Sequence, residues 1–136
     1  MWMDRRALVT GMGAMLVAAK APPVAPLPAT LVKPPRLRPG DVVGLIEPAG
    51  FTDDMFDLDL VKETIVAMGL VPRPAPHLAA RHGYLAGTDK DRAADVNAMF
   101  ADPQVRAVFA VRGGWGCARI LPLLDFATIR ANPKLL

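Results

Sequence analysis

The sequence VRAVFAVRGGWGCARILPLLD, at residues 105–125, decides the fold prediction because three kinds of local structure follow one another in it. Residues 105–111 form a short, valine-rich apolar run, which is typical of a strand buried on both faces. Residues 113–116 form a glycine-rich loop. Residues 119–124 are predicted to form a short helix crossed by a proline. A buried strand followed by a loop and a helix indicates an α/β domain, whose sites lie at the carboxyl ends of parallel strands.

The preceding residues show the same alternation of strands and helices. Residues 41–48, DVVGLIEP, predict a second buried strand, and residues 70–78, with three prolines, predict an irregular edge strand. Two helices are predicted from apolar residues three or four positions apart, the second with a capping box at Thr88. Their buried faces are expected to comprise Leu58, Val61, Ile65 and Met68, and Ala93, Val96, Met99 and Phe100. The predicted fold is α/β, a mostly parallel, flavodoxin-like sheet flanked by helices, and we expect Pro48, Ala49 and Gly50 to form a pocket wall beside the glycine loop.

The first 39 residues differ in composition from the rest. Arg5 and Arg6 precede an apolar stretch at residues 7–19 that is too short to span a bilayer, and small residues follow it. This pattern resembles a twin-arginine export signal over residues 1–21. We therefore expect a periplasmic protein without stable membrane insertion after signal removal, or a cytoplasmic one if the signal is not functional. A buried N-terminal helix or a retained anchor is the alternative. Residues 22–39 contain seven prolines and predict an extended linker, so that the domain spans residues 40–136.

Charge and cysteine content exclude several classes of protein. The whole chain has a net charge of +3, but residues 22–136 contain 13 basic and 12 acidic residues. No basic patch with stacking aromatics is present, so no nucleic-acid partner is expected. The single cysteine excludes an internal disulfide, and no metal or cofactor is predicted. The acidic residues Asp53, Asp54, Asp57 and Asp59 could suggest a metal site, but acids at a helix start complement the helix dipole, which is the interpretation we adopt.

Cys117 lies in the glycine loop and raises the question of a cysteine nucleophile. A strained nucleophile elbow would place glycines two residues before and after it, where Trp115 and Arg119 stand. A cysteine nucleophile also needs a histidine base, and no spacing ties His77 or His82 to this position. We therefore interpret Cys117 as a small packing residue.

The loop allows two further interpretations. It lacks the full G-x-G-x-x-G spacing and the lysine of a phosphate-binding loop, which disfavours a phosphate cradle. Consecutive glycines can instead bring backbone N–H groups close to a ligand, as in an oxyanion hole. Arg112 could bind a carboxylate or form a structural ion pair, and Trp115 could form a pocket wall or simply pack. Residue types alone leave this choice open.

Three longer motifs resemble a known family, which helps to choose between these interpretations of the glycine loop. Residues 83–89 read GYLAGTD and are followed by Arg92, residues 102–107 read DPQVRA, and residues 112–125 read RGGWGCARILPLLD. Together they resemble the N-terminal half of the LD-carboxypeptidases, serine peptidases that trim muropeptides, over residues 37–136. One departure is Glu47, which stands where the family usually has a small residue.

The resemblance implies hydrolysis of an amide bond in a peptidoglycan-derived peptide by a Ser–Glu–His triad. The family's serine lies in a GYSD-like turn shortly after a strand that residues 132–134 match, and its Glu and His come from a C-terminal domain. The 136 residues contain no serine, so no catalytic residue is expected within them, and the triad is expected after Leu136. The residues assigned to the oxyanion and substrate loop are Arg112, Gly113, Gly114, Trp115 and Gly116.

On this interpretation the domain is incomplete, because it is truncated before the C-terminal domain. The expected partners are a muropeptide-like substrate, the missing C-terminal domain and, in a homodimer, a second copy. We expect the isolated chain to be inactive, and either marginally stable or associated through its exposed sheet edge. The alternatives are a non-catalytic ligand-binding α/β module and an inactive fragment.

Overall fold

The computed structural model describes residues 32–136. The predicted export signal at residues 1–21 and most of the predicted linker at residues 22–39 lie outside this range, so the structure does not test them. Within residues 32–136, no helix has the length and apolar character that crossing a membrane requires.

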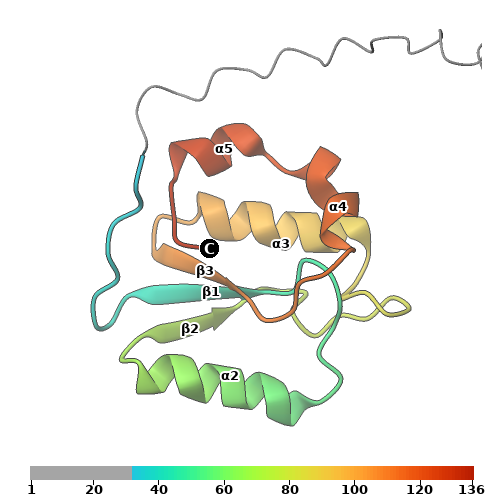
Figure 1. Cartoon of the computed structure of the whole chain (residues 1–136), viewed down its shortest axis with the longest axis horizontal. Coiled ribbons are helices and arrows are strands. Elements are labelled where there is room, and N and C mark those ends of the chain that lie inside the picture. The colour runs from blue at the N-terminus through green and yellow to red at the C-terminus, as the bar shows by residue number, and fades with distance from the viewer. Residues whose placement is uncertain (1–31) are drawn as a thin grey trace, which may run out of the picture. The chain divides into compact units, whose positions relative to one another are not determined.

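Three parallel strands form the centre of the domain, in the order β2-β1-β3 (Figure 1). The middle strand is β1 (Val42–Ile46), which has neighbours on both edges and therefore consists of apolar residues and one glycine. β3 (Val105–Ala110) pairs with one of its edges and β2 (Val71–Pro74) with the other. β2 is an edge strand of the described sheet, a position that tolerates its two prolines, as the sequence predicted.

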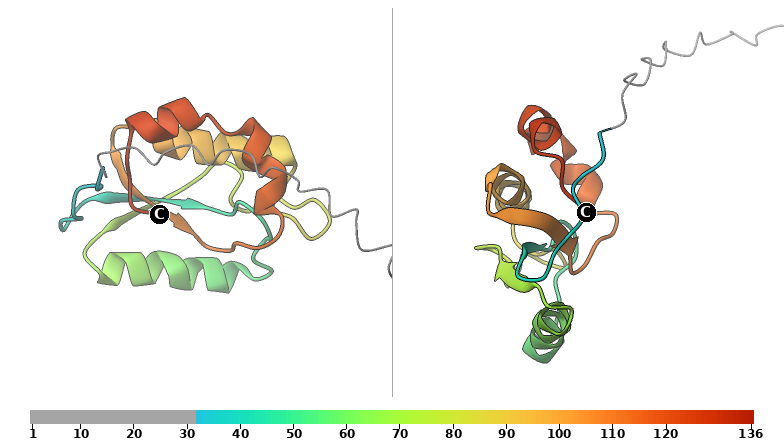
Figure 2. Two further views of the ribbon diagram at one scale, coloured as in Figure 1. Left: turned by 45° about the horizontal axis from the view of Figure 1, so that its top comes forward. Right: turned by 90° about the vertical axis from the view of Figure 1, so that its left-hand side faces the viewer.

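Helices cover both faces of the sheet. α2 (Met55–Ala67) lies on one face, and α3 (Asp89–Ala101) lies on the other together with α5 (Phe126–Ala131) (Figures 1 and 2). The chain moves from β1 outward to β2 and then back across β1 to β3. Because crossovers between parallel strands are right-handed, these opposite directions put α2 and α3 on opposite faces. The α/β fold with a parallel sheet flanked by helices is thus confirmed.

Two apolar layers form the core, one on each side of the sheet. Val43 and Leu45 of β1 pack toward Leu58 and Ile65 of α2. Ile46 belongs to the opposite layer, together with the buried face of α3. In that layer Gly44 allows close packing, since a Cβ atom there would lie 2.6 Å from the sulfur of Met99.

The helix ends follow local sequence signals. Thr88 and Asp91 form the predicted capping box of α3, whose four predicted apolar residues are all buried. Met68, predicted in the buried face of α2, is 64% exposed, so this prediction is wrong. The reason is that α2 ends at Ala67 and Gly69, with φ at +76°, turns the chain away.

The segment after β3 is more broken than predicted. α4 (Cys117–Ile120) begins two residues before the predicted helix and passes into a 3-10 turn, η1 (Leu121–Leu123), that contains the proline. Asp125 caps α5 by accepting a hydrogen bond from the N–H of Thr128 at 3.0 Å. After residues 132–134, which match a strand of the family, the structure has a single parallel bridge from Leu135 to Ala107 of β3.

Candidate functional site

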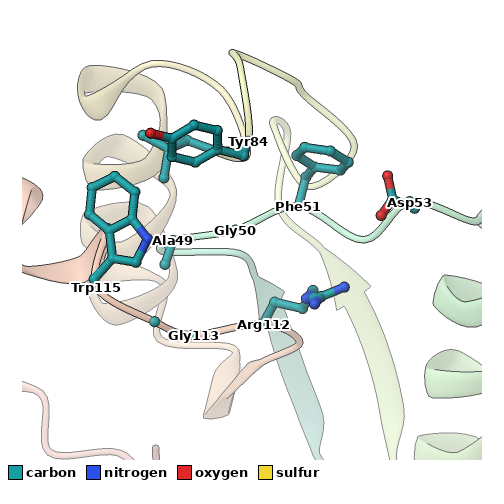
Figure 3. A pocket seen from close by; sticks show the side chains of 11 residues that line it. Ala49, Gly50, Phe51, Asp53, Tyr84, Arg112, Gly113 and Trp115 are labelled. Atoms are coloured by element: carbon teal, nitrogen blue, oxygen red, sulfur yellow. The ribbon is translucent and has the colours of Figure 1, made fainter.

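The loops after β1 and β3 leave the sheet toward opposite faces and enclose a depression between them (Figure 3). Such a reversal of direction is where open α/β sheets place their ligand sites. The depression has a volume of about 210 Å³, and the segment after β2 closes its third side. Its lining residues are Ala49, Gly50, Phe51, Asp53, Tyr84, Leu85, Arg112, Gly113, Gly114, Trp115 and Gly116.

The structure brings most of the predicted site residues together here. All five residues of the predicted substrate loop, Arg112 to Gly116, line the depression, as do Ala49 and Gly50 of the predicted pocket wall. Pro48 does not line it. Its carbonyl oxygen instead accepts a hydrogen bond from Arg92, behind the wall.

The three glycines of the loop have different physical reasons to be glycine. Gly114 has φ at +135°, which strains any other residue. Gly116 has ordinary helical dihedrals, but a Cβ atom there would lie 2.7 Å from Leu85 Cδ2 and 3.2 Å from the Cα and Cβ atoms of Ala49. At Gly113 a Cβ atom would meet nothing within 4 Å. Close packing of the two loops therefore depends on Gly116.

The loop offers hydrogen-bond donors to a ligand. The backbone N–H groups of Gly113, Gly114, Trp115 and Gly116 find no acceptor among residues 32–136. The exposed guanidinium of Arg112 forms no ion pair or hydrogen bond within the same residues. A row of donors beside a free cation is suited to an anionic group or to an oxygen on which negative charge develops.

Arg92 of α3 joins the loops after β1 and β3 by hydrogen bonds. Its side chain is 1% exposed, and Nη1 donates to the carbonyl oxygens of Pro48, after β1, and Gly116, after β3, the latter at 3.0 Å. Nη2 donates to the carboxylate of Asp89, one turn earlier on the helix. One buried guanidinium thus fixes the distance between the two walls of the depression.

Asp89 links Arg92, the clamp between the two loops, to the helix α4 that follows the glycine loop. Nε and Nη2 of Arg119 donate to its carboxylate oxygens at 2.9 to 3.1 Å. The hydrogen bond from Arg119, helped by the nearby charge of Arg92, holds the pKa of the Asp89 carboxyl below its usual value. The GYLAGTD motif and the RGGWGCAR motif therefore meet through one carboxylate and two arginines.

Glu47, the residue that departs from the family pattern, is buried at the end of β1. It is 3% exposed, and Oε1 accepts a hydrogen bond from the Thr52 hydroxyl. Oε2 has no partner among the described residues. Burial raises the pKa of the Glu47 carboxyl, while Thr52 and the charge of Arg112 act in the opposite direction.

Aromatic and charged side chains form the rim. Tyr84 and Trp115 touch with ring centroids 5.5 Å apart (Figure 3). The Arg81 guanidinium lies over the ring of Phe51 at 3.9 Å and pairs with Asp53 at 3.3 Å. Arg81 and Asp53 are therefore paired with each other, whereas Arg112 has no ion-pair partner among residues 32–136.

Cys117 has no base among the described histidines. It begins α4 and is partly buried. The ring of His77 is held by Asp95, with 2.8 Å between Nδ1 and Oδ1, and His82 makes only backbone hydrogen bonds. This arrangement favours the interpretation of Cys117 as a packing residue.

The sequence alone did not place Arg92, Phe51, Asp53 or Tyr84 at the site. For Arg92 a signal existed, because it lies four residues before Val96, on the face of α3 that the apolar pattern marks as buried. For the others no local signal existed. They reach the site through the backbone bridge between Gly50 and Leu85, which joins two distant loops.

Comparisons with known proteins identify the relatives of this chain. The model of the LD-carboxypeptidase N-terminal domain family matches residues 43–136. A Bacillus subtilis protein named as a probable murein peptide carboxypeptidase is 42% identical over 103 residues, which cover 76% of this chain and 32% of that relative. A murein tetrapeptide carboxypeptidase of Pseudomonas aeruginosa is 44% identical over 55 residues, or 40% of this chain and 18% of the relative.

Solved structures show the same likeness. The muramoyltetrapeptide carboxypeptidase from Oxalobacter formigenes matches with a TM-score of 0.62 and 29% identity, over 69% of this chain and 31% of that one. The microcin C7 self-immunity protein MccF in complex with adenosine monophosphate matches with a TM-score of 0.69 and 27% identity, over 77% and 32%. The chain spans about a third of the length of these B. subtilis, O. formigenes and MccF relatives.

Proposed function

The chain belongs to the LD-carboxypeptidase family as an N-terminal domain, and from this premise we propose that it forms the substrate-binding wall of a carboxypeptidase site for murein peptides. The observation that carries the proposal is that one depression contains both backbone N–H groups without an acceptor and the guanidinium of Arg112 without an ion-pair partner, among residues 32–136. A carboxypeptidase must recognise the terminal carboxylate of its substrate and stabilise an oxyanion close to it. The two kinds of donor match these two needs.

In the proposed reaction Arg112 binds the terminal carboxylate and so places the last amide bond against the glycine loop. A serine hydroxyl attacks the amide carbonyl carbon while a base removes the hydroxyl proton. The carbonyl oxygen gains negative charge, which N–H groups of Gly113 and Gly114 stabilise. The C–N bond then breaks, the amine leaves with a proton, and water releases the acyl group from the serine.

The proposal assigns the nucleophile to residues other than these 136, because the chain contains no serine. Arg92 and Gly116 act as positioning residues, since they hold the two walls without lying in the path of the reacting atoms. We expect the chain alone to bind a murein tetrapeptide without hydrolysing it. The second candidate is a ligand-binding module with no catalytic role, which the same unpartnered donors of the depression would serve.

Binding by the intact chain tests the first part. Calorimetry would compare a murein tetrapeptide with the same peptide carrying a C-terminal carboxamide. Wild type should bind the carboxylate form at least about tenfold more tightly, as expected for a charge-assisted bidentate contact. Arg112→Gln should abolish this preference, whereas Arg106→Gln, the same change at an exposed site on β3, should keep it. Equal affinity of wild type for the two peptides would refute the role of Arg112.

A chimera distinguishes the catalytic proposal from the binding module. Residues 43–136 would replace the matching segment of the B. subtilis relative, and release of the terminal residue from the tetrapeptide would be measured. The peptidase proposal predicts turnover that Gly114→Ala lowers strongly and Gly113→Ala lowers less. A folded chimera that binds the peptide without turnover would favour the binding module.

We also propose that the protein is exported, on the basis of Arg5, Arg6 and the apolar stretch that follows them. Cell fractionation of wild type and of Arg5→Lys/Arg6→Lys would test this. Export of both forms at equal levels would contradict the twin-arginine route.

A further inference from the structure

Two large aromatic side chains stand exposed on the same rim of the depression. Tyr84 is 69% exposed and Trp115 is 63% exposed. Their rings touch each other at a tilt of 58°, and they come from separate segments, one after β2 and one after β3 (Figure 3). Because aromatic side chains gain most by burial, a contacting pair left open beside a polar depression indicates a surface that a ligand covers.

The backbone holds both rings in this exposed position. Tyr84 lies at the tip of a tight turn in which His82 and Leu85 exchange backbone hydrogen bonds at 2.8 and 3.1 Å. The turn is fastened to the loop after β1, since the N–H of Ala86 donates to the carbonyl of Ala49 at 2.9 Å. Each ring directly follows a glycine with positive φ, Gly83 at +62° and Gly114 at +135°. The exposed position of the two rings is therefore set by the backbone conformation of the two loops.

The depression is thus divided into two regions of different chemistry. Arg112 lies across from the aromatic pair and offers a cation, and the glycine loop runs between them (Figure 3). The N–H groups of that loop have no acceptor among residues 32–136. A ligand that uses the whole site has an anionic group at one end and a ring with an apolar face at the other. A bare tetrapeptide supplies only the first of these.

Resting on the proposed function, we propose that Tyr84 and Trp115 form a stacking platform for the sugar ring of a muropeptide, so that the site prefers sugar-bearing peptides to free ones. A pyranose has an apolar C–H face and polar edges, which suits stacking on an aromatic ring at the water boundary. A nucleobase shares the stacking chemistry. The 58° tilt favours the sugar, because two rings at this angle form a corner and not the parallel slot that sandwiches a flat base.

The test titrates the intact chain with three probes while the backbone amides are followed by NMR. These are N-acetylmuramyl tetrapeptide, the same tetrapeptide without its sugar, and adenosine monophosphate. For wild type we expect the sugar-bearing peptide to bind roughly three- to tenfold more tightly than the bare one, as for a single aromatic contact. Tyr84→Ala and Trp115→Ala should bring the ratio of the two dissociation constants close to one.

Two further variants control for a loss of folding and for the removal of any exposed aromatic ring. Tyr84→Leu keeps an apolar side chain without the ring and should also lose the preference, even if Tyr84→Ala disturbs folding. Phe56→Ala removes an equally exposed aromatic ring, 70% exposed on α2, and should keep the preference.

Each remaining outcome has a defined meaning. A ratio of one in wild type, with the bare peptide still bound, overturns the platform and leaves the proposed function standing. Binding of neither peptide overturns both. Adenosine monophosphate bound more tightly than the sugar-bearing peptide, and lost in Tyr84→Ala, would replace the sugar by a nucleobase and overturn the assignment made here.

Discussion

Replacing Gly116 by alanine should separate the two walls of the site. The new methyl group would lie 2.7 Å from Leu85 Cδ2 and 3.2 Å from both Cα and Cβ of Ala49. Leu85 can change rotamer, but the backbone of Ala49 can yield only if the loop after β1 moves. Because Gly116 has φ at −61°, alanine introduces no dihedral strain, and the whole cost comes from overpacking.

Overpacking of a close-packed contact costs about 1–3 kcal/mol. Part of this is offset, because alanine restricts the unfolded chain and returns about 0.4–1 kcal/mol. We therefore expect a net loss of about 1–2 kcal/mol in the free energy of unfolding, which for a domain of this size lowers the melting temperature by roughly 5–10 °C. Affinity for a murein tetrapeptide should fall as well, since the displaced loop carries the donors.

Gly113→Ala is the matched control in the same loop. A Cβ atom there meets nothing within 4 Å, and the residue has no positive φ, so its free energy of unfolding should be unchanged or higher than that of wild type by up to about 1 kcal/mol. Urea denaturation followed by circular dichroism measures both variants. Equal stabilities of Gly113→Ala and Gly116→Ala would refute the claim that Gly116 sets the spacing of the two loops.

Three further changes test the clamp and the buried acids. Arg92→Met should lower the free energy of unfolding by about 3 kcal/mol in urea denaturation, because it removes charged hydrogen bonds to the carbonyls of Pro48 and Gly116. Arg119→Met should cost clearly less, and equal losses would contradict the role of Arg92 in joining the two loops. Glu47→Gln should stabilise the protein increasingly as pH rises above 4.5, because burial raises the pKa of Glu47 in the folded state and penalises its charged form. A difference in free energy of unfolding between variant and wild type that stays constant between about pH 4 and pH 8 would argue against this. His77→Asn should lower stability more at about pH 5.5 than at about pH 8.5, because the hydrogen bond to Asp95 raises the pKa of His77. The stabilising effect of that bond is complete below pH 6.5 and is lost as pH rises through the raised pKa. Thermal melts of variant and wild type at the two pH values measure this.

Local signals in the sequence account for most of the fold. The apolar run of β1, the capping box at Thr88 and the stop at Gly69 each act within a few residues, so each could be predicted without knowing the rest of the chain. Met68 shows the limit of periodicity, because its spacing continues the buried face of α2 beyond the residue at which the helix ends.

The site was predictable only in part, for a reason of distance along the chain. The carboxyl ends of parallel strands meet at one edge, so Gly50 and Gly114 could be placed at the same edge because each follows a predicted strand. Arg92 is different, because its acceptors lie 44 and 24 residues away, at Pro48 and Gly116. The hydrogen bond between Glu47 and Thr52 could likewise not be predicted, since it depends on how the following loop folds back.

The central claim is that the loops after β1 and β3 form a binding wall for a murein peptide. The most direct measurement is an amide-resolved NMR titration of the intact chain with a murein tetrapeptide. Shifts should be concentrated at Ala49, Gly50 and Arg112 to Gly116, with little change along α2. Saturable shifts located elsewhere, or none at millimolar peptide with the fold intact, would contradict it.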